Sequence, residues 1–448
     1  MWRTVTLSSL PTKIDLSRYH KVLGAANLVK VHGKVTQIIG LIIESEGPGG
    51  NVGDLSFIYS KESPRPVRAE VVGFKNNKVL LMPLGEMTGI GPGCEVRTSG
   101  KPLAVKVGPA LLGRVLDGLG NPMDGKGPLE TTDEFPVQNS PPNPITRPRI
   151  TEALTTGVRV IDSMLTLGKG QRIGIFAGSG VGKSTTLSMI ARNTSADINV
   201  IGLIGERGRE LRDFIERDLG EEGLRRSVVV CATSDKPALI RIKGAYVATA
   251  MAEYFREQGK DVILMMDSVT RFAMAQREVG LAIGEPPATK GYTPSVFALL
   301  PKLLERSGTS DKGSITGIYT VLVEGDDMNE PIADQVRSIL DGHIVLSRAI
   351  AHQNQYPSVD VLQSVSRLFT EVNTEEHQQM AAKVRKILDT YRKKEDLINI
   401  GAYVDGSDPD VDHAKRMIKD TRVFLGQGIF EPAPFDDSLE KMRQLLSA

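Results

Sequence analysis

Residues 176–185 read Phe176-Ala177-Gly178-Ser179-Gly180-Val181-Gly182-Lys183-Ser184-Thr185. A strand-like run at 172–175 precedes them, and a helix-like run at 187–191 follows. Glycines in such a loop let successive backbone N–H groups turn toward the β- and γ-phosphates of a nucleotide, and the start of the next helix adds its positive dipole end. A glycine-rich turn alone can be an ordinary flexible connection, but the flanking strand and helix favour a phosphate-binding loop.

Within this loop each residue type has an expected role. Lys183 supplies a point charge for the phosphates, and the hydroxyl of Ser184 is the expected Mg²⁺ ligand. The sequence departs from the usual pattern only at Ala177, which lies outside the part that cradles the phosphates. The residues predicted to bind the nucleotide are Gly178, Ser179, Gly180, Val181, Gly182, Lys183, Ser184 and Thr185.

Length and composition narrow the class of protein. The chain has 448 residues, of which 40% are hydrophobic and 24% charged, so it can bury a large core in two or three domains. No apolar run reaches the roughly 18 residues that cross a bilayer, and the first residues do not resemble a signal peptide, so we expect a cytoplasmic protein. A net charge of +1 gives no global electrostatic reason to expect nucleic-acid binding.

The chain divides into three predicted parts. Residues 1–97 hold short apolar or alternating runs separated by turn clusters, which is typical of a small β-barrel. From residue 159 to about residue 347 strand-like and helix-like runs alternate, which predicts a parallel sheet flanked by helices, and we assign residues 98–367 to this α/β domain. Five prolines between Pro136 and Pro148 exclude a continuous helix in the lead-in of this domain. Residues 368–448 are predicted to be helical, with core side chains at three- and four-residue spacing, namely Met380, Val384, Ile387, Leu388 and Tyr391.

Two acidic residues follow apolar strands of the predicted sheet. Asp267 ends the run 262–266, and the carboxyl edge of such a sheet is where nucleotide sites lie, so Asp267 can hold Mg²⁺ through water opposite Ser184. Glu206 follows the run 199–204 and can orient or deprotonate the water that attacks a γ-phosphate. An acidic residue in this position is also a common helix cap or a solvated charge. The phosphate-binding loop nearby favours the Mg²⁺ role of Asp267, whereas the residues alone leave the role of Glu206 open.

Further segments accompany the phosphate-binding loop, at 205–210, 267–272 and 356–360. The combination resembles the rotary ATPase family, which includes the catalytic subunits of ATP synthases. Two stretches, at 232–235 and 271–297, together with 205–210, look like the ATPase of type III protein export, and more specifically like its flagellar form. The resemblance covers nearly the whole chain from about residue 25, and the long run at 271–297 is highly specific.

The resemblance implies a fold and an activity. It implies an N-terminal barrel with an oligomerisation role, a RecA-like ATPase domain and a C-terminal helical domain. It also implies hydrolysis of ATP with Mg²⁺ to assist type III export of flagellar proteins. The implied partners are stalk and regulator proteins of the export apparatus, export substrates and their chaperones, but no nucleic acid. The implied location is the cytoplasm, peripheral to the inner face of the cell membrane.

The resemblance also assigns site residues. Lys183 contacts phosphate, and Glu206 is the general base or the carboxylate that positions water. Arg207 and Arg271 are expected near the γ-phosphate. Tyr356 is expected to stack on adenine, and the resemblance adds two further aromatic residues to the same pocket, Phe424 and Phe430.

Arg367 bears on how copies of the chain assemble. Arg367 ends a Ser-Val-Ser-Arg segment that resembles the arginine finger of the non-catalytic ATP synthase subunit. A finger supplied in trans stabilises charge on the transferred phosphoryl group of a neighbouring subunit. Because one chain carries both Glu206 and Arg367, copies of it can complete each other's sites, and a homo-oligomeric ring, most naturally a hexamer, is implied.

Several features of the sequence distinguish this activity from related functions. The acidic loop of the synthase catalytic subunit is replaced here at 403–410, which argues for hydrolysis and against proton-driven synthesis. A Rho-type RNA-translocating hexameric ATPase shares the core, but residues 1–97 lack the basic and aromatic pattern of an RNA-binding surface. A virulence type III secretion ATPase is a second alternative. A regulatory subunit without turnover is disfavoured by the intact Lys183, Glu206 and Asp267.

Overall fold

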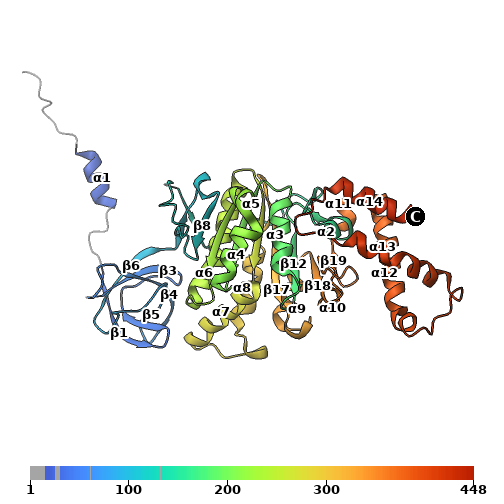
Figure 1. The fold of residues 1–448 in the computed structure, drawn as a ribbon. Helices are drawn as coiled ribbons and strands as arrows, with labels where there is room; N and C mark the ends of the chain where they lie inside the picture. The colour runs from blue at the N-terminus through green and yellow to red at the C-terminus, as the bar shows by residue number, and fades with distance from the viewer. Residues whose placement is uncertain (1–15, 26–30, 61, 132, 448) are drawn as a thin grey trace, which may run out of the picture.

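The computed structural model describes residues 16–25, 31–60, 62–131 and 133–447. It has a barrel at one end, a central α/β body and a group of helices at the other end (Figure 1). A short helix, α1 (Ser17–Ala25), stands apart from these bodies. The predicted fold class is therefore confirmed.

The barrel is built from six antiparallel strands. They close in the order β1-β2-β5-β4-β3-β6, with bounds β1 (Gly33–Ile39), β2 (Ile42–Glu46), β3 (Asp54–Tyr59), β4 (Val67–Lys75), β5 (Lys78–Pro83) and β6 (Glu95–Pro102). Asn76 and Asn77 both have positive φ, 49° and 62°, as the tight turn between β4 and β5 requires. Apolar side chains fill the interior, among them Val35, Ile43, Ile58, Val71, Leu81 and Val96. Strand β6 crosses the expected domain limit at residue 97.

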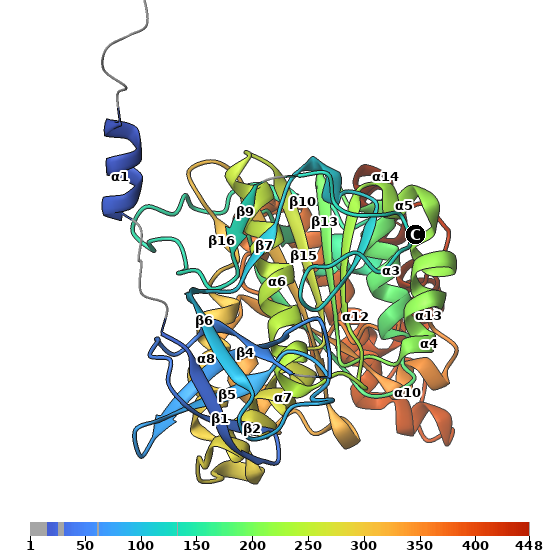
Figure 2. The ribbon, with the colours of Figure 1, turned by 90° about the vertical axis from the view of Figure 1, so that its left-hand side faces the viewer.

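The central sheet is largely parallel, as the alternating pattern predicts. Its path runs β19-β18-β12-β17-β15-β13-β14-β8, and every pairing from β18 to β8 is parallel. The bounds are β8 (Arg114–Asp117), β12 (Arg172–Ala177), β13 (Ile198–Ile204), β14 (Ser227–Ala232), β15 (Asp261–Asp267), β17 (Ser314–Leu322), β18 (Gly342–Leu346) and β19 (Val365–Ser366), with β16 (Gly308–Thr309) beside β17. Figure 2 shows the barrel in front of this sheet.

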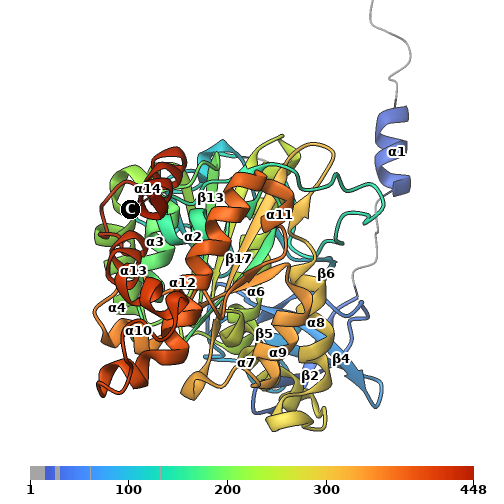
Figure 3. The same ribbon diagram turned by 90° about the vertical axis from the view of Figure 1, so that its right-hand side faces the viewer.

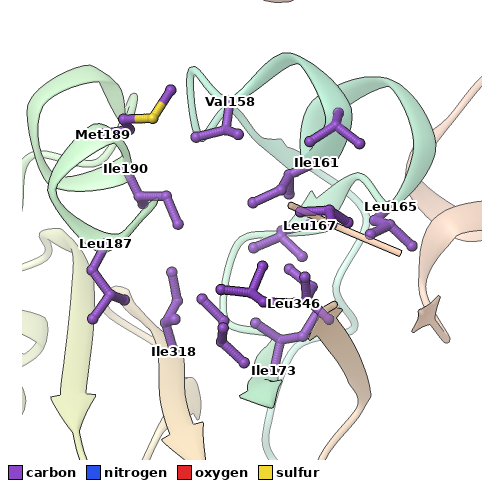
Figure 4. Packing of buried hydrophobic residues seen from close by; sticks show 14 of the residues in the cluster. Val158, Ile161, Leu165, Leu167, Ile173, Leu187, Met189, Ile190, Ile318 and Leu346 are labelled. Carbon is purple, nitrogen blue, oxygen red and sulfur yellow. The ribbon is translucent and has the colours of Figure 1, made fainter. Parts of the chain in front are cut away.

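Helices cover both faces of the sheet because neighbouring strand residues point to opposite sides. Ile175 and Ile318 belong to one buried cluster, whereas the adjacent Phe176 and Tyr319 belong to another. Figure 4 shows Ile173, Ile318 and other members of the first cluster against side chains of two helices, α2 and α3. The helices are α2 (Arg159–Met164), α3 (Lys183–Asn193), α4 (Gly208–Asp213), α5 (Gly220–Arg225), α6 (Ala238–Glu257), α7 (Val269–Ile283), α8 (Pro294–Leu304), α9 (Pro331–Ile339) and α10 (Arg348–His352).

The C-terminal part is helical, as predicted. It contains α11 (Phe369–Val372), α12 (Glu375–Asn399), α13 (Pro409–Leu425) and α14 (Phe435–Ser447), and Figure 3 shows the last three beside one another. Met380, Val384 and Ile387 of α12 are buried, and Leu388 and Tyr391 pack against the same cluster, so the predicted core spacing is confirmed. None of the helices in the described part of the chain combines the length and apolar character that a membrane span requires.

Candidate active site

The loop between β12 and α3 has the strand–loop–helix setting that the sequence predicts. Gly180 and Gly182 have φ values of 78° and 90°, in the left-handed region that favours glycine. A Cβ at Gly178 would lie 2.8 Å from Oδ1 of Asp326 and 2.9 Å from Nη2 of Arg348. The three glycines are therefore required by the backbone path and by close packing.

Lys183 begins α3 and lies between two carboxylates. Its ammonium group donates a hydrogen bond to Oδ1 of Asp267, and its Nζ lies 3.5 Å from Oε1 of Glu206. Asp267 ends β15, is only 4% exposed and also accepts a 2.7 Å hydrogen bond from Oγ1 of Thr320. Burial lowers the pKa of Lys183, but Asp267 and Glu206 raise it more, so the net shift is upward. Lys183 is thus charged before any phosphate arrives.

Glu206 follows β13 at the same edge of the sheet. Burial raises the pKa of its carboxyl group, and the nearby charge of Asp267 raises it further, while Lys183 and Arg271 oppose the rise. A partly buried carboxylate with a raised pKa is a stronger base than an exposed one. The ends of β12, β13 and β15 therefore bring together a cation, a base and a second carboxylate.

The predicted arginines take different positions. Arg271 lies in the first turn of α7 and packs on the backbone before Glu206, since a Cβ at Gly205 would lie 2.7 Å from Cβ of Arg271. Arg207 is exposed and pairs with Glu210 at 3.3 Å. The structure therefore places the Arg271 side chain next to Glu206 and directs Arg207 toward Glu210, a half-buried residue.

Arg367 lies at the opposite edge of the sheet from the phosphate-binding loop. Its backbone N–H donates to the carbonyl of Asp341 at 3.0 Å, and the N–H of Asp341 donates to Arg172, the first residue of β12. The loop begins at the other end of β12, about 17 Å away at about 3.3 Å per residue. The exposed Arg367 side chain has no hydrogen bond or ion pair with any residue in the described ranges. It does not reach the loop of its own chain.

A cavity of about 780 Å³ lies beside the loop. Tyr356, 43% exposed, lines it, and a Cβ at Gly182 would lie 3.5 Å from Cδ1 of its ring. Oγ of Ser358 donates to the carbonyl of Val181 at 2.6 Å, which attaches this segment to the loop. The other side of the cavity is formed by residues 426–429, between α13 and α14.

The structure does not bring Phe424 or Phe430 to the lining of this cavity. Phe424 is 7% exposed and packs in the core, because its position on α13 faces inward. Phe430 is 72% exposed, and the guanidinium of Arg192 lies 4.8 Å from the centre of its ring. Sequence reasoning missed Gln427, which lines the cavity within the same segment; the glycines on either side of it were the available signal.

The oxygen atoms near the loop suit Mg²⁺. Ser184, Glu206 and Asp267 line a second cavity of about 170 Å³, and hard oxygen donors are the ligands that Mg²⁺ prefers. Among the described residues, no group of three or more histidine, cysteine or acidic side chains is arranged to hold a metal by itself. An ion at this place would therefore need phosphate and water oxygens as well, which is the usual situation for Mg²⁺ bound with a nucleotide.

The raised pKa of Glu206 predicts an effect on stability. A group whose pKa is higher in the folded protein destabilises that state as pH rises above its ordinary value of 4.5. Glu206→Gln should therefore raise the melting temperature of the nucleotide-free protein at pH 7–8, and the gain should disappear as the pH falls toward 4.5. Glu216→Gln, which changes an exposed carboxylate that pairs with Arg212 at 2.8 Å, serves as the control and should show no such trend. A lower melting temperature for Glu206→Gln at pH 8 would contradict this account.

Comparison with known families gives three matches along the chain. The nucleotide-binding domain of the ATP synthase alpha/beta family matches residues 157–366, and the beta-barrel domain of the same family matches residues 35–100. The C-terminal domain of the T3SS EscN ATPase matches residues 373–444. The three matches follow the barrel, the α/β body and the C-terminal helices.

The similarity to individual relatives extends over nearly the whole chain. The flagellum-specific ATP synthase of Bacillus subtilis (strain 168) is 58% identical over 93% of this chain and 95% of its own length. The type 3 secretion system ATPase of Xanthomonas euvesicatoria is 51% identical over 91% of this chain and 92% of its own length. The solved structure of the assembled ATPase EscN from the enteropathogenic E. coli type III secretion system has a TM-score of 0.88 and 46% identity, covering 92% of this chain and 100% of that one. The solved structure of EscN in complex with its central stalk EscO has a TM-score of 0.86, with the same identity and coverage.

Proposed function

The chain belongs to the ATP synthase alpha/beta family, among its flagellar and type III secretion ATPases, and on that premise we propose how its site hydrolyses ATP. The enzyme is an ATP hydrolase of this family. The observation that carries the residue assignment is the convergence of Lys183, Glu206 and Asp267 at the ends of three parallel strands. Lys183 binds the β- and γ-phosphates, and Glu206 orients or deprotonates the attacking water. Arg271 lies beside Glu206 and stabilises its ionised form.

The remaining parts of the site bind the substrate. Backbone N–H groups of residues 178–185 cradle the phosphates, and Tyr356 stacks on the base in the neighbouring cavity. Ser184, and Asp267 through water, would hold Mg²⁺, which neutralises phosphate charge when bound. Phe424 then supports this cavity from the core, and Phe430 lies on its outer side against Arg192.

Each site is completed by a neighbouring copy of the chain. Arg367 lies too far from its own loop, so it acts as a finger on the nucleotide of an adjacent subunit in a ring, most naturally a hexamer. The assembled form of EscN supports this arrangement. Residues 1–97 contribute to the oligomer, residues 98–367 carry the ATPase chemistry, and residues 368–448 form the helical domain. The complex of EscN with its central stalk EscO supports a stalk protein as a partner of the ring.

The ring serves type III export of flagellar proteins from the cytoplasmic side of the cell membrane. Its 58% identity with a flagellum-specific ATP synthase, against 51% with a secretion-system ATPase, supports the flagellar assignment. The stalk, regulator proteins, export substrates and chaperones are its proposed partners. The RNA-translocating alternative is not favoured, because the relatives that match are export ATPases.

An export experiment tests this function. In a strain that lacks the gene, the wild-type chain should restore secretion of flagellar filament protein, whereas Glu206→Gln at equal abundance should not, since hydrolysis is lost. Quantifying filament protein and virulence effectors in the culture medium checks both the flagellar and the secretion assignment. Restored effector secretion without filament protein would reassign the chain to the virulence apparatus.

A further inference from the structure

The base side of the nucleotide cavity is carried by a segment of the C-terminal part, residues 426–430, which we call the 426–430 loop. Its residues 426–429 line the cavity together with Gly180 and Gly182 of the phosphate-binding loop. The backbone N–H of Gln427 donates to the carbonyl of Tyr356 at 2.9 Å, so the loop is directly joined to the aromatic wall. The position of this wall relative to the phosphates depends on what holds the loop.

Arg159, the first residue of α2, holds both ends of the loop. Its side chain is buried, with the residue only 4% exposed, although arginine is seldom buried without partners. Nη1 donates to the carbonyls of Phe424 at 3.2 Å and of Gly426 at 2.6 Å, and Nη2 pairs with the carboxylate of Glu431. One guanidinium group therefore binds acceptors on both sides of the 426–430 loop.

Gln427 fixes the middle of the loop to the same helix start. Its Oε1 accepts from the N–H of Arg159 at 2.7 Å, and its Nε2 donates to the carbonyls of Gly157 and Glu431, both at 2.9 Å. All three partners are backbone groups, namely those of Arg159, Gly157 and Glu431. Although Gln427 lines the cavity, its amide is used to place the backbone.

The start of α2 is itself fixed to the phosphate-binding helix. A Cβ at Gly157 would lie 2.2 Å from Cβ of Asn193, the last residue of α3, so the two backbones are in close contact. Gly157 has φ of 70°, which also favours glycine there. A continuous set of contacts thus runs from α3 through Gly157 and Arg159 to the wall at Tyr356.

We propose that Arg159 and Gln427 are positioning residues that set the distance between the base wall and the phosphate-binding loop. The proposal rests on the function proposed above, because it assigns the cavity at Tyr356 to the nucleotide base. A wall held in its binding position does not have to be ordered when the nucleotide arrives, and this preorganisation contributes affinity. Loosening the wall should weaken binding of the nucleoside part, while Lys183 and Glu206 keep their places.

The test compares ATP with inorganic tripolyphosphate, which has the phosphates but no base. For Arg159→Lys we expect the KM for ATP to rise about tenfold, with kcat lowered less than twofold. Inhibition of ATP hydrolysis by tripolyphosphate should keep an inhibition constant within twofold of that of the wild type. Gln427→Met, which keeps the side-chain length and removes its hydrogen bonds, should behave in the same way.

Arg385→Lys is the matched control. Arg385, on α12, donates to the carbonyls of Val361 and Met164, both at 2.8 Å, so it also joins the C-terminal part to the α/β body without touching the 426–430 loop. Its KM for ATP should stay within twofold of the wild type. Melting temperatures of all variants show whether they fold.

Each outcome decides the question. An unchanged KM for ATP in folded Arg159→Lys would overturn the proposal. An equal loss of affinity for ATP and for tripolyphosphate in this variant would overturn it as well. So would a wild-type enzyme that hydrolyses ATP but is not inhibited by tripolyphosphate. If Arg159→Lys fails to fold, Glu431→Gln decides, since it weakens the half-buried end of the network, where the carboxylate pairs with Arg159 and accepts from the N–H of Gly428, and should raise KM about threefold. A wild-type chain that binds no ATP would instead refute the proposed function.

Discussion

We expect Lys183→Ala to remove both ATP binding and hydrolysis, and Glu206→Gln to remove hydrolysis while leaving ATP binding largely intact. Lys183 is charged and already lies at the loop, so its loss removes the main phosphate cation. It also leaves the carboxylates of Glu206 and Asp267 facing incoming phosphate without compensation. In the proposed mechanism Glu206 acts only on the attacking water, so Glu206→Gln should slow the chemical step, typically by 10²-fold or more.

Two measurements separate these effects. Binding of a fluorescent ATP analogue should be lost in Lys183→Ala and retained in Glu206→Gln, and phosphate release should be near background in both. Glu216→Gln, which removes an exposed carboxylate that lines neither cavity, should retain wild-type turnover. Retention of more than roughly a tenth of wild-type turnover by Glu206→Gln, against the usual 10²-fold loss, would show that Glu206 is not the base.

The parts of this molecule that the sequence predicted well are those governed by local rules. The loop at 176–185, the strands that end in Glu206 and Asp267, and the helical spacing of Met380, Val384 and Ile387 follow from turn chemistry and periodicity. The carboxyl ends of parallel strands lie at the same edge of a sheet. The positions of Glu206 and Asp267 after two such strands therefore also predicted that their carboxylates would lie close together.

The remaining features depend on how distant segments pack. The sequence pattern around Phe424 did not show which side of α13 faces the core. Phe430 lies beyond the end of that helix, where contacts with a distant residue, Arg192, place its ring. No sequence pattern marks Arg159 as a residue of the nucleotide site. Its contacts are with backbone carbonyls about 265 residues further along the chain, and only the folded structure brings these together. Arg367 was assigned by resemblance, and only the antiparallel pairing of β19 with β18 places it at the far edge of the sheet.

This placement leads to the prediction with the clearest outcome, which concerns two inactive variants. A site built from one subunit's Glu206 and its neighbour's Arg367 is incomplete in a ring made entirely of Glu206→Gln or entirely of Arg367→Ala, so both should lack turnover. Removal of an arginine finger lowers turnover by about 10³-fold or more. Lys415→Ala, which removes an exposed lysine far from the loop in sequence, is a suitable charge control and should keep its activity.

Mixing the two inactive variants should restore activity. An Arg367→Ala subunit keeps a sound Glu206 and receives the sound Arg367 of an adjacent Glu206→Gln subunit, so some interfaces in a mixed ring are complete. The variants should be combined as monomers before assembly, and a tag on one of them should verify co-assembly by pull-down. Phosphate release should then rise from background to a maximum at intermediate ratios, as the number of mixed interfaces does.

The alternative arrangement gives a different curve. If Arg367 acted on its own subunit, every subunit in the mixture would still lack one essential group, and no ratio would restore turnover. A ring that needs several intact sites at once would also stay inactive, but titrating wild type with Arg367→Ala separates the two. Independent sites lose activity in proportion to the variant fraction, whereas a concerted ring loses it much more steeply. Verified mixed rings that stay at background, together with a proportional titration, would therefore exclude Arg367 as a finger in trans.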